Sequence, residues 1–362
     1  MIEAMTQPAS PAGNTGPGGS AGQANAHNTG NTGNTDNTGS AATLRDWWQA
    51  ARPHTWPNAF APVIAGTGAA AFWGSAHVGK ALLALGVAWA LIVGVNYAND
   101  YSDGIRGTDD NRTGPTRLTA SGLAAPENVK MAAFIAFGVA AALGIILAAV
   151  SSWWLVLVGA VCIAAAWFYT GGSRPYGYAG LGELAVFVFF GLVAVMGTEF
   201  TQSGFVSREG FWSAIGIGAI SASVNLANNV RDLGSDASAG KQTLAVRLGD
   251  ARARNLFTAL TLTPFVASAM LAVSYTPALI AFLALPFAVA SIMRVRGGAS
   301  GKDLIPVLGM NGRTMLIWAV LTAIALAIAG YFYWGQTVPY IGESDFGWTM
   351  DIPLDRPGIL AP

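Results

Sequence analysis

Asn96-Tyr-Ala-Asn99-Asp100-Tyr-Ser-Asp103-Gly-Ile-Arg-Gly-Thr-Asp109-Asp110 is a polar stretch that follows directly on a hydrophobic run. About 130 residues later the pattern returns as Asn225-Leu-Ala-Asn228-Asn229-Val-Arg-Asp232-Leu-Gly-Ser-Asp236. In both copies an Asn is followed by a second Asn after three residues and by an Asp after four more. This spacing places all three side chains on one face of a helix. The sequence therefore predicts two matching polar faces in an otherwise hydrophobic chain.

The composition around these stretches is that of a membrane protein. Apolar residues make up 53% of the chain and charged residues 10%, where a soluble domain carries about 25% charged residues. Apolar segments of about 18 to 25 residues predict an all-α bundle of transmembrane helices. Nine spans are expected, at about 58–74, 80–99, 129–149, 153–170, 181–200, 211–229, 255–273, 277–293 and 313–334. The single Cys162 lies inside one span and excludes a disulfide within the chain.

The two ends of the chain differ from this hydrophobic middle. Residues 1–43 are rich in Asn, Thr and Gly and have almost no large apolar side chains, so we expect a disordered tail. Residues 44–51 carry Trp47 and Trp48 beside charged side chains, which predicts a short helix at the membrane interface. The transmembrane domain is expected over 44–336, and residues 337–362 form a C-terminal tail.

The distribution of charge predicts the orientation. With a cytoplasmic N-terminus and nine spans, sixteen of the Lys and Arg residues fall on the cytoplasmic side and three on the other. The expected location is the cell membrane, with the C-terminus outside. Both polar stretches then face the cytoplasm at the same mouth of the bundle.

Carboxylates that converge at such a mouth repel one another unless a cation lies between them. No His or Cys cluster accompanies them, and carboxylate and amide oxygens are hard ligands, so Mg²⁺ fits better than zinc or copper. Basic residues in the adjoining loops are more than a bare metal needs, and they suit a metal bound to a polyanion such as diphosphate. The acids are Asp100, Asp103, Asp109, Asp232 and Asp236, and the bases are Arg106, Arg112, Arg117, Arg231, Lys241 and Arg247.

Residues 99–109 and 228–249 resemble the paired Asp-rich motifs of the UbiA superfamily of intramembrane aromatic prenyltransferases. Three further stretches, 52–66, 114–122 and 169–183, are similar to the branch that acts on 1,4-dihydroxy-2-naphthoate. The resemblance covers roughly residues 45–334. Position 107 is Gly where the commoner superfamily spacing has an Asp, and the next acids are Asp109 and Asp110. The naphthoate branch resembles this longer spacing, and which of the two acids reaches the metal stays open.

The resemblance implies transfer of a polyprenyl group from polyprenyl diphosphate to 1,4-dihydroxy-2-naphthoate, with loss of CO₂ and diphosphate, giving demethylmenaquinol. The implied catalytic residues are Asp100, Asp103, Asp232, Asp236 and Tyr169. The implied metal ligands are Asn99, Asp103, Asp109, Asn228, Asp232 and Asp236. Diphosphate contacts are expected from Lys241, Arg117, Arg247 and Arg112, and acceptor contacts from Arg52 or Arg174. The expected partners are the two substrates, Mg²⁺ and membrane lipid, and nucleic acid is not among them.

Two other functions fit parts of the pattern. The same fold with another acceptor would prenylate 4-hydroxybenzoate, a haem, a chlorophyllide or a glycerol phosphate, depending on the pocket lining. A secondary transporter also has polar groups within its spans. That class places them at mid-membrane, whereas here the acids lie at span ends on one side. For Tyr169, an interfacial aromatic residue is the alternative to a group that shields an allylic cation.

Overall fold

The computed structural model describes residues 42–107 and 117–335, and within these ranges it contains helices and turns but no strand. This confirms the all-α prediction. The helices before the second motif are α1 (Leu44–Ala50), η1 (Pro53–Thr55), α2 (Pro57–Phe72), α3 (Val78–Ile105), α4 (Pro126–Ala149), α5 (Leu155–Phe168), η2 (Tyr176–Ala179), α6 (Gly182–Val186), η3 (Phe187–Met196), α7 (Gly197–Ser203) and α8 (Arg208–Arg231). After it come α9 (Leu233–Ser238), α10 (Leu244–Leu248), α11 (Asp250–Ala272), η4 (Thr276–Ala284), α12 (Leu285–Arg296), η5 (Gly301–Leu304) and α13 (Ile305–Gly335).

Seven helical segments of the described ranges are long and apolar enough to cross a membrane. They are α3, α4, α6 to α7, α8, α11, η4 to α12, and η5 to α13. The predicted spans at 58–74 and 153–170 correspond to α2, of 16 residues, and α5, of 14 residues. The positions of the spans therefore agree with the sequence, while their number, nine, stays a prediction.

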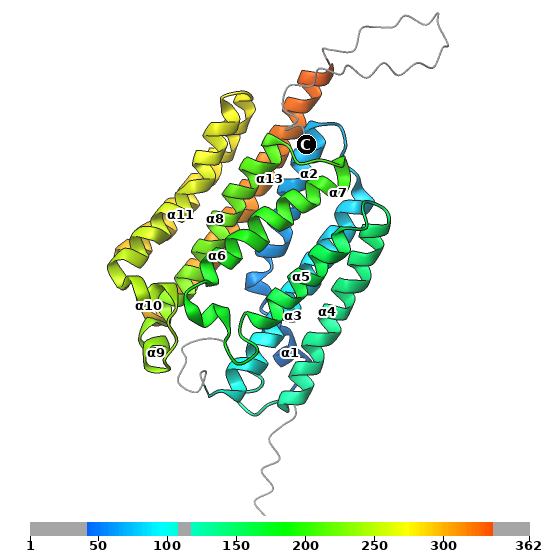
Figure 1. The fold of residues 1–362 in the computed structure, drawn as a ribbon. Helices are drawn as coiled ribbons and strands as arrows, with labels where there is room; N and C mark the ends of the chain where they lie inside the picture. The colour runs from blue at the N-terminus through cyan, green and yellow to red at the C-terminus, as the bar shows by residue number, and fades with distance from the viewer. Residues whose placement is uncertain (1–41, 108–116, 336–362) are drawn as a thin grey trace, which may run out of the picture. The chain divides into compact units, whose positions relative to one another are not determined.

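Helix α8 lies at the centre of the bundle and packs against α2, η3, α11 and α13 (Figure 1). Its apolar window is 78% buried, more than that of any other candidate span. Small residues allow neighbouring helices to pack this closely against α8. A Cβ added to Gly191 would lie 2.5 Å from the Cα of Gly218, so η3 and α8 touch backbone to backbone. The second polar motif occupies the C-terminal end of this central helix.

The first polar motif lies on α3 itself. The sequence places the end of the second span near residue 99, but the helix continues to Ile105. Asn96, Asn99 and Asp103 therefore follow one another along the last turns of α3, as the three-then-four spacing predicts. Figure 1 shows this end of α3 on the side of the bundle where α1, α9 and α10 also lie.

The interfacial helix α1 is fixed at its start by a capping box. The Thr43 hydroxyl accepts from the Asp46 N–H, and the Asp46 carboxylate accepts from the Thr43 N–H at 2.8 Å. The Asp46 carboxylate also accepts from the Thr43 hydroxyl, and the hydrogen bonds from this hydroxyl and from the Thr43 N–H hold the pKa of Asp46 below its usual range. The segment after α1 is tied to α3, because Asn96 donates to the Ala51 carbonyl and to the Thr55 hydroxyl, both at 3.0 Å. Thus Asn96 positions the start of α2 beside the first motif.

Candidate active site

Asp103 lies in the last turn of α3 and is surrounded by groups from three other segments. Its carboxylate is 3.6 Å from the Arg117 guanidinium and 3.7 Å from the Lys241 ammonium. The Tyr178 hydroxyl donates a hydrogen bond to the same carboxylate. Asp103 is 4% exposed, so these charges interact in a poorly hydrated setting.

Lys241 connects the two motifs. Its ammonium lies 3.7 Å from Asp103 and 3.9 Å from Asp236, one carboxylate from each motif. It also lies 4.7 Å from the centre of the Tyr178 ring, where a cation is attracted to the aromatic face. The predicted convergence of the two polar stretches at one end of the bundle is therefore found in the structure.

Tyr178 is a site residue that the sequence reading missed. It belongs to η2, and its carbonyl accepts from the Gln242 N–H at 3.0 Å, which holds η2 against the segment that carries Lys241. The available signal was its place in the stretch 169–183, which was read for its family likeness and not residue by residue.

The other acids of the motifs have different surroundings. Asp232 caps the end of α8 and forms a two-point ion pair with Arg231, at 2.7 and 2.6 Å. Asp100 is 1% exposed, and its two oxygens accept from the N–H groups of Leu118 and Thr119 at 3.0 and 2.9 Å. Asp100 therefore fixes the loop that carries Arg117, and its carboxylate is occupied by the backbone.

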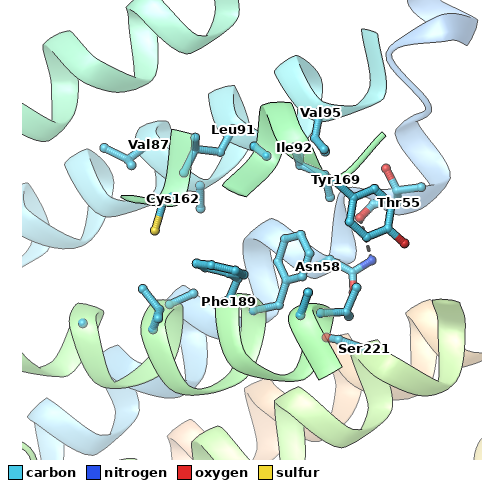
Figure 2. A pocket seen from close by; sticks show the side chains of 18 of the residues that line it. Thr55, Asn58, Val87, Leu91, Ile92, Val95, Cys162, Tyr169, Phe189 and Ser221 are labelled. Carbon is cyan, nitrogen blue, oxygen red and sulfur yellow. Dashed lines mark hydrogen bonds between the residues drawn. The ribbon is translucent and has the colours of Figure 1, made fainter. Parts of the chain in front are cut away.

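A cavity of about 310 Å³ begins one helical turn from these acids and runs between α2, α3, α4, α5 and η3 (Figure 2). Asn99 and Asn228 belong to its wall, each four residues before an Asp of its motif. On α3 the lining extends from Asn99 back to Ala84, a rise of roughly 22 Å. Beyond the polar end the wall is apolar, with Val63, Val87, Leu91, Leu147, Phe189 and Val193 among its residues. The shape suits a molecule with a charged head and a long hydrocarbon chain.

The polar end of the cavity contains two tyrosines. The Tyr169 hydroxyl donates to Asn225 Oδ1 at 3.2 Å, and Tyr169 lines the same cavity as Thr55 and Asn58, which Figure 2 labels. The Tyr176 hydroxyl donates to the Ala165 carbonyl at 2.8 Å, and burial raises its pKa to about 12. The Tyr176 phenol is therefore neutral near pH 7.

Only some of the residues predicted to contact the diphosphate or the acceptor lie at the cavity. Arg52 lines the cavity and has a φ of 52°, the one positive value among the non-glycine residues described. Such a conformation is costly and is often found at functional sites. Arg174 and Arg247 are exposed and have no place in the cavity wall as described. Arg106, which the sequence places among the bases suited to a polyanion, donates to the carbonyls of Thr170 and Gly172. Asp109, Asp110 and Arg112 lie outside the described residues.

Oxygen ligands for a divalent cation are available at this end of the cavity. No group of three or more His, Cys, Asp or Glu side chains able to hold a metal occurs in residues 42–107 and 117–335. Asp103 and Asp236, however, lie within 4 Å of the same ammonium group, and Asn99 and Asn228 of the motifs belong to the adjoining wall. This donor chemistry fits Mg²⁺, which uses few protein ligands and fills its shell with water and phosphate oxygens.

Comparison with known proteins agrees with this geometry. The model of the UbiA prenyltransferase family matches residues 59–304. A Mycobacterium tuberculosis protein named 1,4-dihydroxy-2-naphthoate octaprenyltransferase is 54% identical over 295 residues, which cover 82% of this chain and 99% of that protein. An Escherichia coli protein of the same name is 38% identical over 231 residues, covering 62% of this chain and 75% of the relative.

A solved structure has the same fold. It is a UbiA homologue from Archaeoglobus fulgidus, bound to GPP and Mg²⁺, with a TM-score of 0.56 and 15% identity over 77% of this chain and 99% of that one. At this identity the likeness is one of fold. The family match covers more than half of the sequence and includes both Asp-rich motifs. The chain belongs to the UbiA prenyltransferase family.

Proposed function

We propose that this protein transfers a polyprenyl group from polyprenyl diphosphate to 1,4-dihydroxy-2-naphthoate, releasing diphosphate and CO₂ and giving demethylmenaquinol. The observation that carries the proposal is the 54% identity to a relative of that activity, over almost its whole length. A family member with an apolar cavity next to a cluster of acids and bases supports the same reaction type.

The two ends of the cavity give each substrate a place. The hydrocarbon chain lies along the apolar wall, and the diphosphate lies at the end near Asp103, Arg117 and Lys241. When bound there, Mg²⁺ supplies positive charge that offsets the charge growing on the leaving diphosphate. Asp103 and Asp236 would hold it, with Asn99 and Asn228 beside them. Arg117 and Lys241 stabilise the same leaving group by electrostatics, usually the largest catalytic contribution.

The acceptor meets the allylic carbon at the polar end of the cavity. The carbon–oxygen bond to diphosphate breaks, and the Tyr169 ring presents its negative face to the allylic cation. The ring carbon that bears the carboxylate forms the new carbon–carbon bond. CO₂ then leaves, and its bonding electrons return to the ring and restore aromaticity. Arg52, in the cavity wall, binds the carboxylate of the acceptor before this step.

The chain is a multi-pass membrane protein, since the residues that the structure describes contain seven long apolar helices and the chain belongs to an intramembrane family. The charge asymmetry of its loops supports a cell-membrane location with the N-terminus and the active site on the cytoplasmic side. The acceptor is then supplied from the cytoplasm, and the product enters the bilayer.

A direct assay tests the proposal. The purified protein in lipid nanodiscs receives octaprenyl diphosphate, Mg²⁺ and either 1,4-dihydroxy-2-naphthoate or 4-hydroxybenzoate, and lipid-soluble products are identified by mass spectrometry. We expect a prenylated product from the naphthoate and none after removal of Mg²⁺ with EDTA. Product from 4-hydroxybenzoate alone would show that this acid, and not the naphthoate, is the acceptor. No product from either acid would contradict the proposal.

A further inference from the structure

Asn225 belongs to the second polar motif but is not among the residues assigned to the metal or the diphosphate. Its counterpart in the first motif, Asn96, holds the segment between α1 and α2. Asn225 lines the cavity, and its Oδ1 accepts the hydrogen bond from the Tyr169 hydroxyl at 3.2 Å. Figure 2 labels Tyr169 among the lining side chains. Asn225 therefore holds the phenol whose ring is proposed to face the allylic cation.

Glu183 is a buried acid that contacts Asn225 and has no place in the cavity wall. It lies in the first turn of α6 and is 4% exposed. Its Oε1 accepts from Asn229 Nδ2 at 2.6 Å, and the Asn225 amide interacts with the same carboxylate. The second contact falls short of a normal hydrogen bond, since Asn225 Nδ2 and Glu183 Oε2 are both buried without a partner of good geometry among the described residues. One is a donor and the other an acceptor, so the two atoms complement each other.

The Glu183 carboxylate decides which way the Asn225 amide faces. An ionised carboxylate only accepts hydrogen bonds, so the amide nitrogen turns toward Glu183 and the amide oxygen toward Tyr169. The Tyr169 hydroxyl must then donate to that oxygen. A phenol that donates to a polarised acceptor holds more negative charge on its oxygen and ring, and hydrogen bonds in such a chain strengthen one another in a poorly hydrated setting. This strengthens the attraction of the ring for a cation, which comes from the negative face of the ring.

Gly182 leaves the space in which these side chains meet. A Cβ added at this position would lie 2.9 Å from the Tyr169 hydroxyl oxygen and 3.0 Å from Asn225 Nδ2. Both distances are shorter than an ordinary van der Waals contact, so a larger residue would displace the hydroxyl, the amide or both. Gly182 and Glu183 thus act on the same two groups, and neither of them lines the cavity.

We infer that Glu183 is a positioning residue that acts through Asn225 on Tyr169, and that Gly182 provides the space for this arrangement; the inference rests on the proposed function. Glu183 orients the amide, Asn225 accepts the phenolic proton, and the Tyr169 ring is thereby held and polarised in the cavity wall. Because Glu183 lies outside that wall, it does not touch either substrate. Its replacement should change the rate of the chemical step and leave the binding of both substrates intact.

A double-mutant cycle between Glu183→Gln and Tyr169→Phe tests whether one residue acts through the other. Gln keeps an oxygen for Asn229 but presents an NH₂ group in place of the second acceptor, and Phe removes only the phenolic hydroxyl. The wild type, the two single variants and the double variant are compared in nanodiscs with octaprenyl diphosphate, 1,4-dihydroxy-2-naphthoate and Mg²⁺. The value of kcat, the KM for each substrate and the thermal unfolding are measured on the same preparations.

The expected pattern is one of coupling. Each single variant should lower kcat about tenfold, the order expected for one hydrogen bond, and should keep both KM values within about twofold of the wild type. The double variant should lose no more than either single variant, because Glu183 has nothing left to position once the hydroxyl is gone. Losses that multiply to about 100-fold, a near-wild-type kcat of Glu183→Gln, or higher KM values at unchanged kcat would overturn the inference.

Gly182→Ala is a second test that does not depend on the folding of Glu183→Gln. It should lower kcat about tenfold in the wild type, because the added Cβ displaces the Tyr169 hydroxyl. In the Tyr169→Phe background it should have little further effect, since the nearest ring carbon would lie at an ordinary contact distance of 3.7 Å. Equal losses in the two backgrounds would also overturn the inference.

Glu209 provides a matched control. It is a buried Glu in the first turn of α8, 2% exposed, which accepts from the Trp73 indole at 3.2 Å and lies outside the cavity wall. Glu209→Gln should keep kcat within about twofold of the wild type in both backgrounds. A tenfold loss that disappears in Tyr169→Phe would show that the coupling is not specific to Glu183 and would overturn the inference.

The wild type separates the two levels of the account. If it prenylates the naphthoate but the losses in the cycle multiply, the inference about Glu183 fails alone. If it forms no product from the naphthoate, the proposed function fails.

Discussion

At the scale of single residues, Lys241 links the two Asp-rich motifs, because it contacts one carboxylate from each. Two carboxylates from different helices, Asp103 and Asp236, lie within 4 Å of its ammonium. Without that charge they would repel each other across a poorly hydrated space. In the proposed reaction the same ammonium stabilises the anionic leaving group. Lys241 is therefore expected to contribute to turnover more than to folding.

Replacing Lys241 tests this role. Lys241→Gln should lower kcat by about 10²- to 10³-fold, the usual effect of removing one electrostatic contact to a transition state. Lys130→Gln is the control, because Lys130 also lies over a tyrosine ring, at 5.7 Å from that of Tyr101, but belongs to α4 outside the site. We expect Lys130→Gln to keep near wild-type turnover in the nanodisc assay. Similar turnover of both variants would contradict the assignment.

Asp100 and Asp103 differ in their partners, so substitution of each by Asn should affect different properties, stability for Asp100 and turnover for Asp103. Asp103→Asn removes the charge that faces Arg117 and Lys241, so we expect turnover to fall at least about 100-fold with little change in thermal stability. Asp100→Asn replaces one of two buried oxygens that accept from backbone N–H groups. That should cost about 1–3 kcal/mol of stability.

Thermal unfolding and turnover of the two variants, measured on the same preparations, check this pair. The opposite assignment, a stable Asp100→Asn without activity, would show that Asp100 acts in the reaction. Asp100 is among the catalytic acids that the family resemblance implies, because it belongs to the matching motif. A motif does not report which backbone N–H groups a loop 18 residues later brings to one of its acids.

At the scale of helices, glycines in the cavity wall leave open the space that the proposed function assigns to the prenyl chain. Gly144 on α4, Gly159 on α5 and Gly197 on α7 all line the cavity. A Cβ added to Gly144 would meet only Val87, at 3.9 Å, and one added to Gly159 or Gly197 would meet no atom within 4 Å. Larger side chains would therefore fit the backbone and occupy space that the chain of the donor uses.

Gly144→Leu should shift the donor preference toward shorter chains. We expect the ratio of kcat/KM for farnesyl diphosphate to that for octaprenyl diphosphate to rise at least about tenfold, since filling an apolar pocket by one or more methylenes changes specificity by that order. Gly138→Leu is the control, because Gly138 lies on the same helix, also has open space at its Cβ, and is exposed outside the cavity wall. An unchanged ratio in Gly144→Leu would show that the chain takes another path.

The positions of several long helices follow from the sequence. Apolar periodicity and length locate α3, α4, α8 and α11 within a few residues, because a bilayer requires long uninterrupted apolar helices. The sequence predicts the end of the second span near residue 99, where the run turns polar, whereas α3 continues to Ile105. Asn96 and Asn99 stay helical because their side chains find partners, Asn96 with Ala51 and Thr55, and Asn99 with the Thr170 hydroxyl at 2.7 Å.

At the scale of the whole molecule, the proposed orientation places both motifs on the cytoplasmic side. Cys162 is the only cysteine, so a Cys162→Ala background allows single cysteines to report sidedness. In intact cells, a membrane-impermeant maleimide should label Ala76→Cys, in the exposed turn between α2 and α3, and leave Ser238→Cys, exposed at the end of α9 near the site, unlabelled. Labelling of Ser238→Cys and protection of Ala76→Cys would reverse the orientation.

The convergence of the two motifs is the feature of the whole molecule that the sequence predicted most usefully. It follows from counting spans, since the ends of α3 and α8 fall on the same side of the bundle. The groups that complete the site are harder to predict. Tyr178 lies in a segment without charge or repetition, and only the packing of η2 against the segment that carries Lys241 brings it to Asp103.

The fate of the acceptor carboxylate is the most direct test of the proposed prenyl transfer with loss of CO₂. The wild-type protein receives octaprenyl diphosphate, Mg²⁺ and 1,4-dihydroxy-2-naphthoate labelled with ¹⁴C at the carboxyl carbon, and labelled CO₂, diphosphate and lipid-soluble product are counted together. If the proposed reaction is right, all three form in equal amounts, and none forms without Mg²⁺. A lipid-soluble product that retains the label, or release of diphosphate without labelled CO₂, would contradict it.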